Sequence, residues 1–239
     1  VCVFPKLEEI HLSEMNMLTD IWHTEVNADS FSSLISVHID GCKKIDKIFP
    51  SHMKGWFASL NSLKAYDCES VEVIFEIKDS QQVDVSCVID TNLQIIHLWD
   101  LPNLKLVWST DPGGILNFKR LRSIEVDDCD KLRNVFPASV AKDVRKLESM
   151  SVRSCEGMLE IVEDGSETNN ETILIFPELT YMELYSLSNL KRFYKGKHFI
   201  ECPRLKKLTM GCCKKLKTFP TETSETTNEE VKPVFSAEK

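Results

Sequence analysis

Long apolar segments are missing from this 239-residue chain. A helix that crosses a membrane needs a run of about eighteen apolar residues, and no such run occurs, so we expect no membrane span. A signal peptide is also missing. Because the chain begins at Val1, just before a regular segment, we expect a fragment of a larger protein, in which missing targeting signals indicate little.

Catalytic and cofactor-binding motifs are missing as well. The sequence has no Gly-x-x-x-x-Gly-Lys-Ser/Thr loop to hold phosphates, no Gly-x-Ser-x-Gly elbow and no His-Glu-x-x-His pair for zinc. It also lacks zinc-finger spacing and the aromatic-glycine signature of RNA-binding domains, which argues against nucleic acid as a partner. We therefore predict a protein that is not an enzyme and that holds no cofactor and no metal.

A repeated spacing runs along almost the whole chain. Its regular copies read Leu-x-x-Leu-x-Leu-x-x-Cys, and most intervals between anchor leucines fall in the range of leucine-rich repeats. The anchors are Leu7, Leu34, Leu60, Leu93, Leu121, Leu147, Leu179 and Leu205. Apolar residues three and five positions after each anchor alternate with polar ones, which is typical of a strand with one buried face.

Such short strands can bury their apolar face only by stacking on their neighbours in a parallel ladder. We therefore predict an α/β fold, a leucine-rich-repeat solenoid that forms a right-handed, horseshoe-shaped superhelix with its strand ladder on the concave face. Residues 1–220 should form about eight repeats. Residues 221–239 are rich in Thr, Ser and Glu, so we expect a disordered acidic tail.

A second buried position is expected eight residues after each anchor. It is occupied by Met15, Cys42, Cys68, Leu101, Cys129, Cys155, Leu187 and Cys213. A free cysteine behaves as a small apolar residue, so packing explains five of the nine cysteines. An odd number of unpaired cysteines favours a reducing compartment, and we expect a cytoplasmic location. Met15, Leu101 and Leu187 lie 86 residues apart, so the larger unit is a triplet of repeats.

On the convex side we expect short helices mixed with extended turns. Residues Ala138 to Lys146 follow a proline and carry Val140 and Val144 on one face, which predicts a helix. Residues 51–57 should form its counterpart.

The concave face is the predicted binding surface, because its outward side chains form one continuous surface on a rigid scaffold. Exposed Trp, Tyr and Arg contribute strongly to protein interfaces. The candidate partner-binding residues are His38, Tyr66, His97, Trp99, Asp127, Arg153 and Tyr185. Alternatively, the aromatic residues stack on one another and shield the ladder. Lys64 interrupts the row of His11, His38 and His97, so this row is interpreted as a polar column and not as a metal site.

Charge is distributed unevenly along the sequence. Residues 191–217 contain ten lysines and arginines against the single Glu201, whereas the long loops and the tail are acidic. A possible basic contact patch comprises Lys191, Arg192, Lys206, Lys207, Lys214 and Lys215. It could meet an acidic surface of a partner or of the parent protein, or the lysines could simply solvate exposed turns.

The repeats resemble the leucine-rich-repeat region of plant coiled-coil nucleotide-binding disease-resistance proteins, which are intracellular immune receptors. The resemblance rests on residues 121–137 (LRSIEVDDCDKLRNVFP), on Phe176 to Leu184 and on Cys202 to Leu208. It implies a protein-binding module that senses a pathogen effector or a guarded host protein. It also implies an autoinhibitory contact with the receptor's own nucleotide-binding domain, which these residues do not include.

The alternative is the substrate-recruiting arm of an F-box ubiquitin ligase, whose repeats also place cysteine after the strand. Such repeats usually continue from the cysteine into a regular helix. Here Phe49-Pro50, Phe136-Pro137 and Phe219-Pro220 occupy that point, and proline disfavours helix at the residue before it. This difference favours the receptor interpretation.

Overall fold

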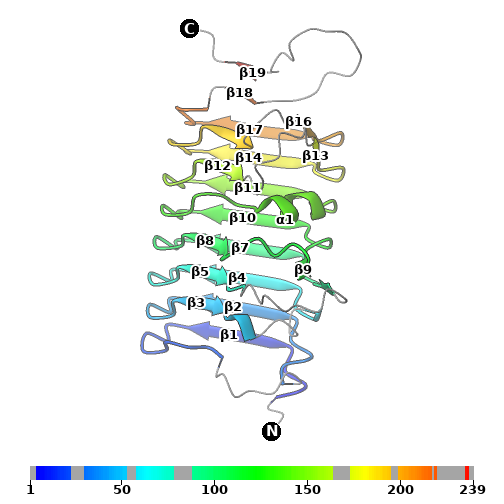
Figure 1. The fold of residues 1–239 in the computed structure, drawn as a ribbon. Helices are drawn as coiled ribbons and strands as arrows, with labels where there is room; N and C mark the ends of the chain where they lie inside the picture. The colour runs from blue at the N-terminus through cyan, green and yellow to red at the C-terminus, as the bar shows by residue number, and fades with distance from the viewer. Residues whose placement is uncertain are drawn as a thin grey trace.

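The eight predicted strands form one parallel sheet. The structure is a computed structural model that describes residues 4–22, 30–52, 58–77, 88–163, 173–194, 199–216, 218–219 and 235–236. The strands are β1 (Glu9–Ser13), β2 (Ser36–Asp40), β4 (Ser62–Tyr66), β7 (Ile95–Trp99), β10 (Ser123–Asp127), β11 (Ser149–Arg153), β14 (Tyr181–Tyr185) and β17 (Lys207–Gly211). They pair in chain order, and Figure 1 shows them stacked from the N-terminal to the C-terminal end. The predicted parallel ladder and solenoid are confirmed.

The register follows the repeat spacing without a slip. Ile10 pairs with Val37 and Leu12 with Ile39, and the equivalent positions pair in every later repeat. From β2 to β14 the second and fourth residues of each strand are fully buried, because both neighbouring strands cover them. A slip by one residue would turn this apolar set outward, so burial fixes the register.

The segments after the cysteine position form a second set of short parallel strands. These are β3 (Lys47–Phe49), β5 (Val73–Phe75) and β8 (Leu106–Trp108) in one sheet, and β12 (Glu160–Val162) with β15 (Arg192–Tyr194) in another, with Phe136 bridging to Val162. Further parallel pairs are β6 (Ile89–Asp90) with β9 (Leu116–Asn117) and β13 (Ile173–Ile175) with β16 (Phe199–Glu201). β18 (Thr218–Phe219) and β19 (Phe235–Ser236) form an antiparallel pair. The expected extended turns are therefore largely strands.

Aromatic side chains from the second set of strands stack inside the solenoid. Phe49 and Phe75 have ring centroids 5.3 Å apart, and Trp108 follows at 5.9 Å from Phe75. Phe136 continues the row at 6.0 Å from Trp108. All four are buried, and offset aromatic pairs at this spacing add about 0.5–1.5 kcal/mol each to the area they bury. This row ties successive repeats together.

The predicted helix exists but is shorter than expected. Helix α1 covers Ala138–Asp143 and ends at Val144, whose backbone leaves the helical region with φ −75 and ψ 47. The prediction that it continues to Lys146 is therefore wrong, although Val140 and Val144 are both buried as expected. The prediction for residues 51–57 falls mainly on 53–57, outside the described residues. The tail prediction also lies outside them, apart from β19.

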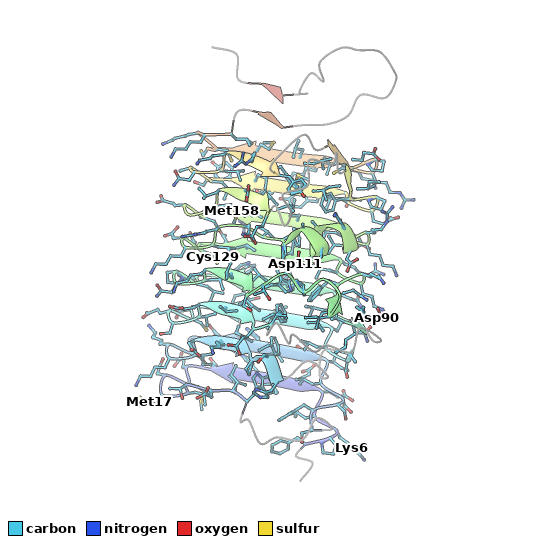
Figure 2. The ribbon with its side chains drawn as sticks, in the orientation of Figure 1. Lys6, Met17, Asp90, Asp111, Cys129 and Met158 are labelled. Carbon is cyan, nitrogen blue, oxygen red and sulfur yellow. The ribbon has the colours of Figure 1, made fainter. Side chains whose placement is uncertain are left out.

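The first repeat differs from the others because β1 has a neighbour on one side only. The prediction that Met15 fills a buried position is wrong, since its side chain is 47% exposed. Met17, at the N-terminal end in Figure 2, is 78% exposed. The equivalent positions Cys42, Cys68 and Leu101 are fully buried.

The triplet periodicity is visible in the contacts between repeats. Asn103 donates to the Glu69 carbonyl (2.6 Å) and accepts from Lys131 (2.6 Å). Asn189, 86 residues later, donates to the Glu156 carbonyl (2.8 Å) and also accepts from a lysine, Lys215 (2.5 Å). The same bridging amide thus occurs in the second and third triplets, whereas the equivalent position of the first triplet holds Met17, whose sulfur accepts from Lys44 at 3.5 Å.

Candidate protein-binding surface

The outward face of the eight-stranded sheet, which we call the ladder face, carries two regular columns of side chains. The third residue of each strand forms the central column: His11, His38, Lys64, His97, Glu125, Ser151, Glu183 and Thr209. The fifth residue forms the outer column: Ser13, Asp40, Tyr66, Trp99, Asp127, Arg153, Tyr185 and Gly211. All seven candidate partner-binding residues belong to these two columns. Parallel pairing places neighbours in a column roughly 4.8 Å apart.

Aromatic rings are in mutual contact in the first half of the ladder face, which consists of β1, β2, β4 and β7. The imidazoles of His11 and His38 are stacked with centroids 4.3 Å apart, and His38 meets the Tyr66 ring edge-on at 5.1 Å. Tyr66 and Trp99 lie 4.9 Å apart, and His97 is parallel to Trp99 at 6.0 Å. The expected stacking is therefore present, yet Trp99 remains 38% exposed. Stacking holds Trp99 in place and leaves more than a third of its surface accessible.

Two histidines of this half, His38 and His97, have lowered pKa values. Burial lowers the pKa of His38, and the neighbouring His11 and Lys64 lower it further. Burial also lowers the pKa of His97 and outweighs the opposing effect of Glu125, whose Oε1 lies 3.9 Å from His97 Nε2. Lys64 is therefore the fixed positive charge of the central column in this half.

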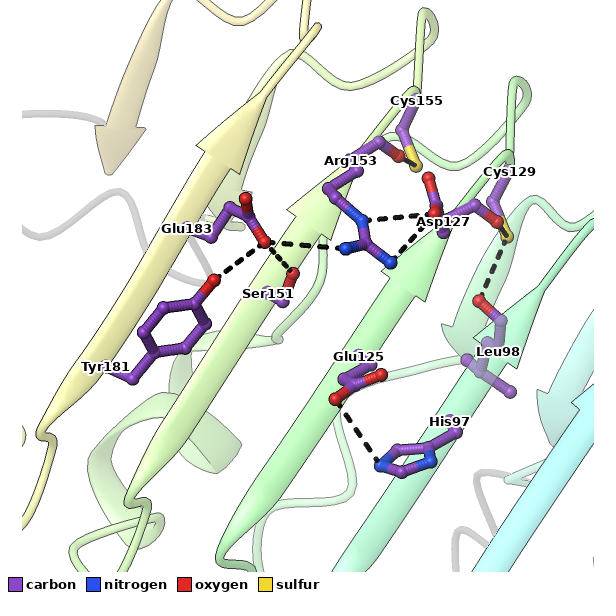
Figure 3. A network of polar contacts seen from close by, with 10 residues as sticks. All are labelled: His97, Leu98, Glu125, Asp127, Cys129, Ser151, Arg153, Cys155, Tyr181 and Glu183. Carbon is purple, nitrogen blue, oxygen red and sulfur yellow. Dashed lines mark hydrogen bonds and ion pairs between the residues drawn. The ribbon is translucent and has the colours of Figure 1, made fainter. Parts of the chain in front are cut away.

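The second half of the ladder face is organised by a polar network around Arg153 (Figure 3). Its guanidinium lies between two carboxylates, with Nη2 3.0 Å from Asp127 Oδ2 and Nη1 3.6 Å from Glu183 Oε2. The same Glu183 oxygen accepts hydrogen bonds from Ser151 Oγ at 2.8 Å and from the Tyr181 hydroxyl at 2.9 Å. Burial alone would raise the pKa of Glu183, but these two hydrogen bonds and Arg153 lower it below its usual range.

Tyr185 is the most exposed aromatic residue of the outer column, with 45% of its surface accessible. Its ring lies over Gly211 of the next strand, and a Cβ atom at Gly211 would come 2.6 Å from Tyr185 Cε2. The absence of a side chain at Gly211 thus makes room for the tyrosine ring.

The residue after each strand adopts a left-handed backbone conformation in all eight repeats. Most of these positions carry no glycine: φ is 47° at Asp67, 54° at Asp100 and 51° at Asp128. Aspartate tolerates this conformation better than most residues. We call these three exposed residues the aspartate rim, because each directly follows an outer-column residue. Analysis of the strand pattern alone missed it, although the Asp in Tyr-Asp-Cys, Trp-Asp-Leu and Asp-Asp-Cys recurs at a fixed position.

The cysteines of the repeat lattice are packing residues. Cys42, Cys68, Cys129 and Cys155 are free thiols with no exposed surface. The Cys68 thiol donates to the carbonyl of Tyr66, two residues earlier, at 3.1 Å, which spans the left-handed turn. Burial raises the pKa of Cys68 and that of Cys202 to about 12. Such thiols are protonated and weakly nucleophilic at neutral pH.

The six residues of the predicted basic patch are distributed over both ends of the last strands. Lys206 and Lys207 lie at the start of β17 and Lys214 and Lys215 follow its end, whereas Lys191 and Arg192 lie at β15. Several already have partners: Arg192 Nε is 3.3 Å from Glu160 Oε2, and Lys207 Nζ is 5.1 Å from the Tyr181 ring centroid. Among the described residues, no group of three or more His, Cys, Asp and Glu side chains could hold a metal ion.

Comparison with known proteins agrees with this architecture. The family model described as "Plant disease resistance protein RPS2-like, leucine-rich repeats" matches residues 6–156, which is more than half of the chain. The chain belongs to this family. Its leucine-rich repeats are 26% identical over 183 residues, 77% of the chain, to "Putative disease resistance protein At4g19050" of Arabidopsis thaliana. The match covers 13% of that relative's length.

No solved structure matches these leucine-rich repeats. Within the described residues of the chain, no helix is long and apolar enough to cross a membrane. The recognition of a plant disease-resistance repeat region from its sequence phrases is therefore confirmed at the level of the family.

Proposed function

We propose that the chain is the recognition and autoinhibition module of an intracellular plant immune receptor. Its ladder face binds a protein, either a pathogen effector or a guarded host protein. In the resting state it also contacts the nucleotide-binding domain of the same receptor in the cytoplasm. Membership of the disease-resistance family supports this role, and the relative's much greater length supports a place within a larger receptor.

The observation that carries the proposal is the exposed Trp99 on a rigid, fully hydrogen-bonded sheet. Trp and Tyr are among the residue types that dominate binding energies at interfaces. Trp99 is fixed by Tyr66 on one side and by the ring of His97 on another. A preorganised aromatic side chain loses little conformational entropy when a partner covers it.

The ladder face fits binding better than catalysis. The buried lattice thiols have raised pKa values and are poor nucleophiles. The charged side chains of the second half bind one another through Arg153 and serve to position residues.

The test uses the receptor that contains these residues, expressed in leaves. Trp99→Ala and Tyr185→Ala should change cell death, either by loss of the response to the pathogen or by a response without it, at unchanged protein level. Leu159→Ala is the matched control, because Leu159 is 40% exposed but lies beside β12, outside the ladder face. If the two ladder-face variants accumulate normally and behave like the control, the proposal is wrong.

A further inference from the structure

The first half of the ladder face carries an aromatic pair, Tyr66 and Trp99, beside the aspartate rim. Each rim residue immediately follows an outer-column residue, and the main chain fixes the arrangement: Asp67 N donates to the Trp99 carbonyl at 3.2 Å, and Asp100 N donates to the Asp127 carbonyl at 3.0 Å. The rim residues therefore follow the ends of three successive paired strands, and neighbouring strands are about 4.8 Å apart.

No rim carboxylate forms a direct ion pair in the described part of the chain, although Glu69 and, to a lesser extent, Asp67 and Asp100 raise the pKa of nearby Lys43. None of the ion pairs among the described residues involves a rim residue. The nearby Lys43 is bound to Glu69, with Nζ 2.9 Å from Oε1. Burial and the close carboxylates of Asp127, Asp100 and Asp130 raise the pKa of Asp128, which is consistent with crowding of like charges.

The charges around Trp99 determine whether a positively or a negatively charged partner segment is attracted to this surface. The three rim carboxylates, together with Asp40 and Glu125, outnumber the two nearby lysines, Lys64 and Lys43, and Lys43 is itself paired with Glu69. His38 and His97 add no positive charge at neutral pH, because their pKa values are lowered. The carboxylate of Asp127 is already matched by Arg153. An acidic protein segment or a nucleic acid backbone would therefore be repelled here, whereas a cationic segment would be attracted.

We propose that the aromatic pair and the aspartate rim bind an exposed arginine- or lysine-containing segment of the partner protein. The cationic side chain lies against the exposed part of the Trp99 ring, and its charged group is directed to the rim carboxylates. A cation over a tryptophan ring within about 6 Å is a favourable arrangement, and arginine forms paired hydrogen bonds with carboxylates. This inference rests on the proposed function and specifies the chemistry of the partner at that surface.

The binding test uses the whole chain and two short labelled peptides, one of alternating arginine and glycine and one with glutamate in place of arginine. Fluorescence anisotropy should show binding of the arginine peptide only, weakened by salt. Trp99→Ala should weaken it about fivefold. The triple variant Asp67→Asn, Asp100→Asn and Asp128→Asn should weaken it about tenfold. Asparagine keeps the left-handed backbone favourable, so this variant is expected to fold.

A matched control separates the local site from the net charge of the chain. Glu8→Gln, Asp20→Asn and Asp46→Asn together remove the same charge from exposed positions outside the outer column and the rim. This control should leave the arginine-peptide affinity within about twofold, because exposed charges beyond a Debye length of roughly 10 Å are screened. Equal weakening by the control and by the rim variant would overturn the inference, as would tighter binding of the glutamate peptide.

The same variants distinguish failure of this inference from failure of the proposed function. If Trp99→Ala alters cell death by the receptor but the rim variant alters neither cell death nor peptide binding, the ladder face recognises a partner that is not cationic. If Trp99→Ala and Tyr185→Ala both leave the receptor unchanged in leaves, the proposed function itself fails, whatever the peptide does.

Discussion

The two halves of the ladder face belong to the same parallel sheet. They differ in how many of their polar and charged side chains form hydrogen bonds and ion pairs with one another. In the second half, Arg153 neutralises Asp127 and Glu183, and Ser151 and Tyr181 complete the hydrogen bonding. In the first half, Trp99 is partly exposed, and no residue of the aspartate rim forms a direct ion pair among the described residues. Side chains that satisfy one another stabilise the solenoid, whereas those left unsatisfied on a rigid sheet are available to a partner.

Both halves depend on the same buried lattice, so the largest effect is expected from a change in that lattice. Leu121 is fully buried beneath β10, where the two halves meet. Leu121→Ala should lower the free energy of unfolding by about 2–5 kcal/mol, because the loss of apolar contacts leaves a cavity. Urea denaturation followed by circular dichroism measures this change. An unchanged urea midpoint would show that the anchor leucines do not stabilise the fold.

The regular lattice is the part of the structure that sequence predicts well. Leu121 and its equivalents recur at a nearly fixed interval, and alternation after each anchor identifies strand and buried face together. The end of helix α1 was predicted less well, because the backbone leaves the helical region at Val144, which the spacing of Val140 and Val144 does not reveal. Met15 was mispredicted because spacing does not reveal which strand has a single neighbour.

The candidate surface could be predicted only in part. The column positions of Trp99, Arg153 and Tyr185 follow from strand alternation. The ion pairs of Arg153 with two carboxylates depend on the strand register. Arg153 pairs with Asp127 on β10 and with Tyr185 on β14, and Glu183 lies two residues before Tyr185. The aspartate rim depends on a left-handed turn, which a pattern of apolar residues does not encode.

A change in the second half should affect stability more than recognition. Arg153→Met leaves Asp127 and Glu183 without their shared cation, and we expect a loss of about 1 kcal/mol at pH 7 because the pair is partly exposed. Glu183 has a lowered pKa in the folded state, so its contribution is present above the unfolded pKa and is lost as pH falls through the folded value. Denaturation midpoints of the variant should therefore depend less on pH below about 4.5.

Protonation of His97, in the first half, should destabilise the fold in a different pH range. The pKa of His97 is lowered by burial, so the unfolded chain binds its proton more readily than the folded protein. The stabilising contribution of neutral His97 is present above about pH 6.5 and is lost as pH falls below that value. His97→Gln should reduce the fall in unfolding free energy between pH 7 and about pH 5. An unchanged pH profile would contradict a buried neutral imidazole at this site.

The smallest expected effect concerns the local electrostatic potential at Trp99. Trp22 and Trp108 are buried, whereas Trp99 is exposed beside the aspartate rim. The fluorescence that is lost in Trp99→Phe should be quenched more efficiently by caesium than by iodide, because the rim attracts cations and repels anions. The triple Asp→Asn rim variant should reduce this difference. Equal quenching by both ions in the unaltered chain would contradict a negative potential there.

The most direct test of the division between the two halves compares Trp99→Ala with Arg153→Met in the receptor. Cell death in leaves reports recognition or autoinhibition, and denaturation of the purified chain reports stability. We predict that Trp99→Ala changes cell death at equal protein level, whereas Arg153→Met lowers stability and leaves cell death unchanged at equal protein level. Unchanged cell death with Trp99→Ala, together with altered cell death in a stable Arg153→Met receptor, would contradict the account.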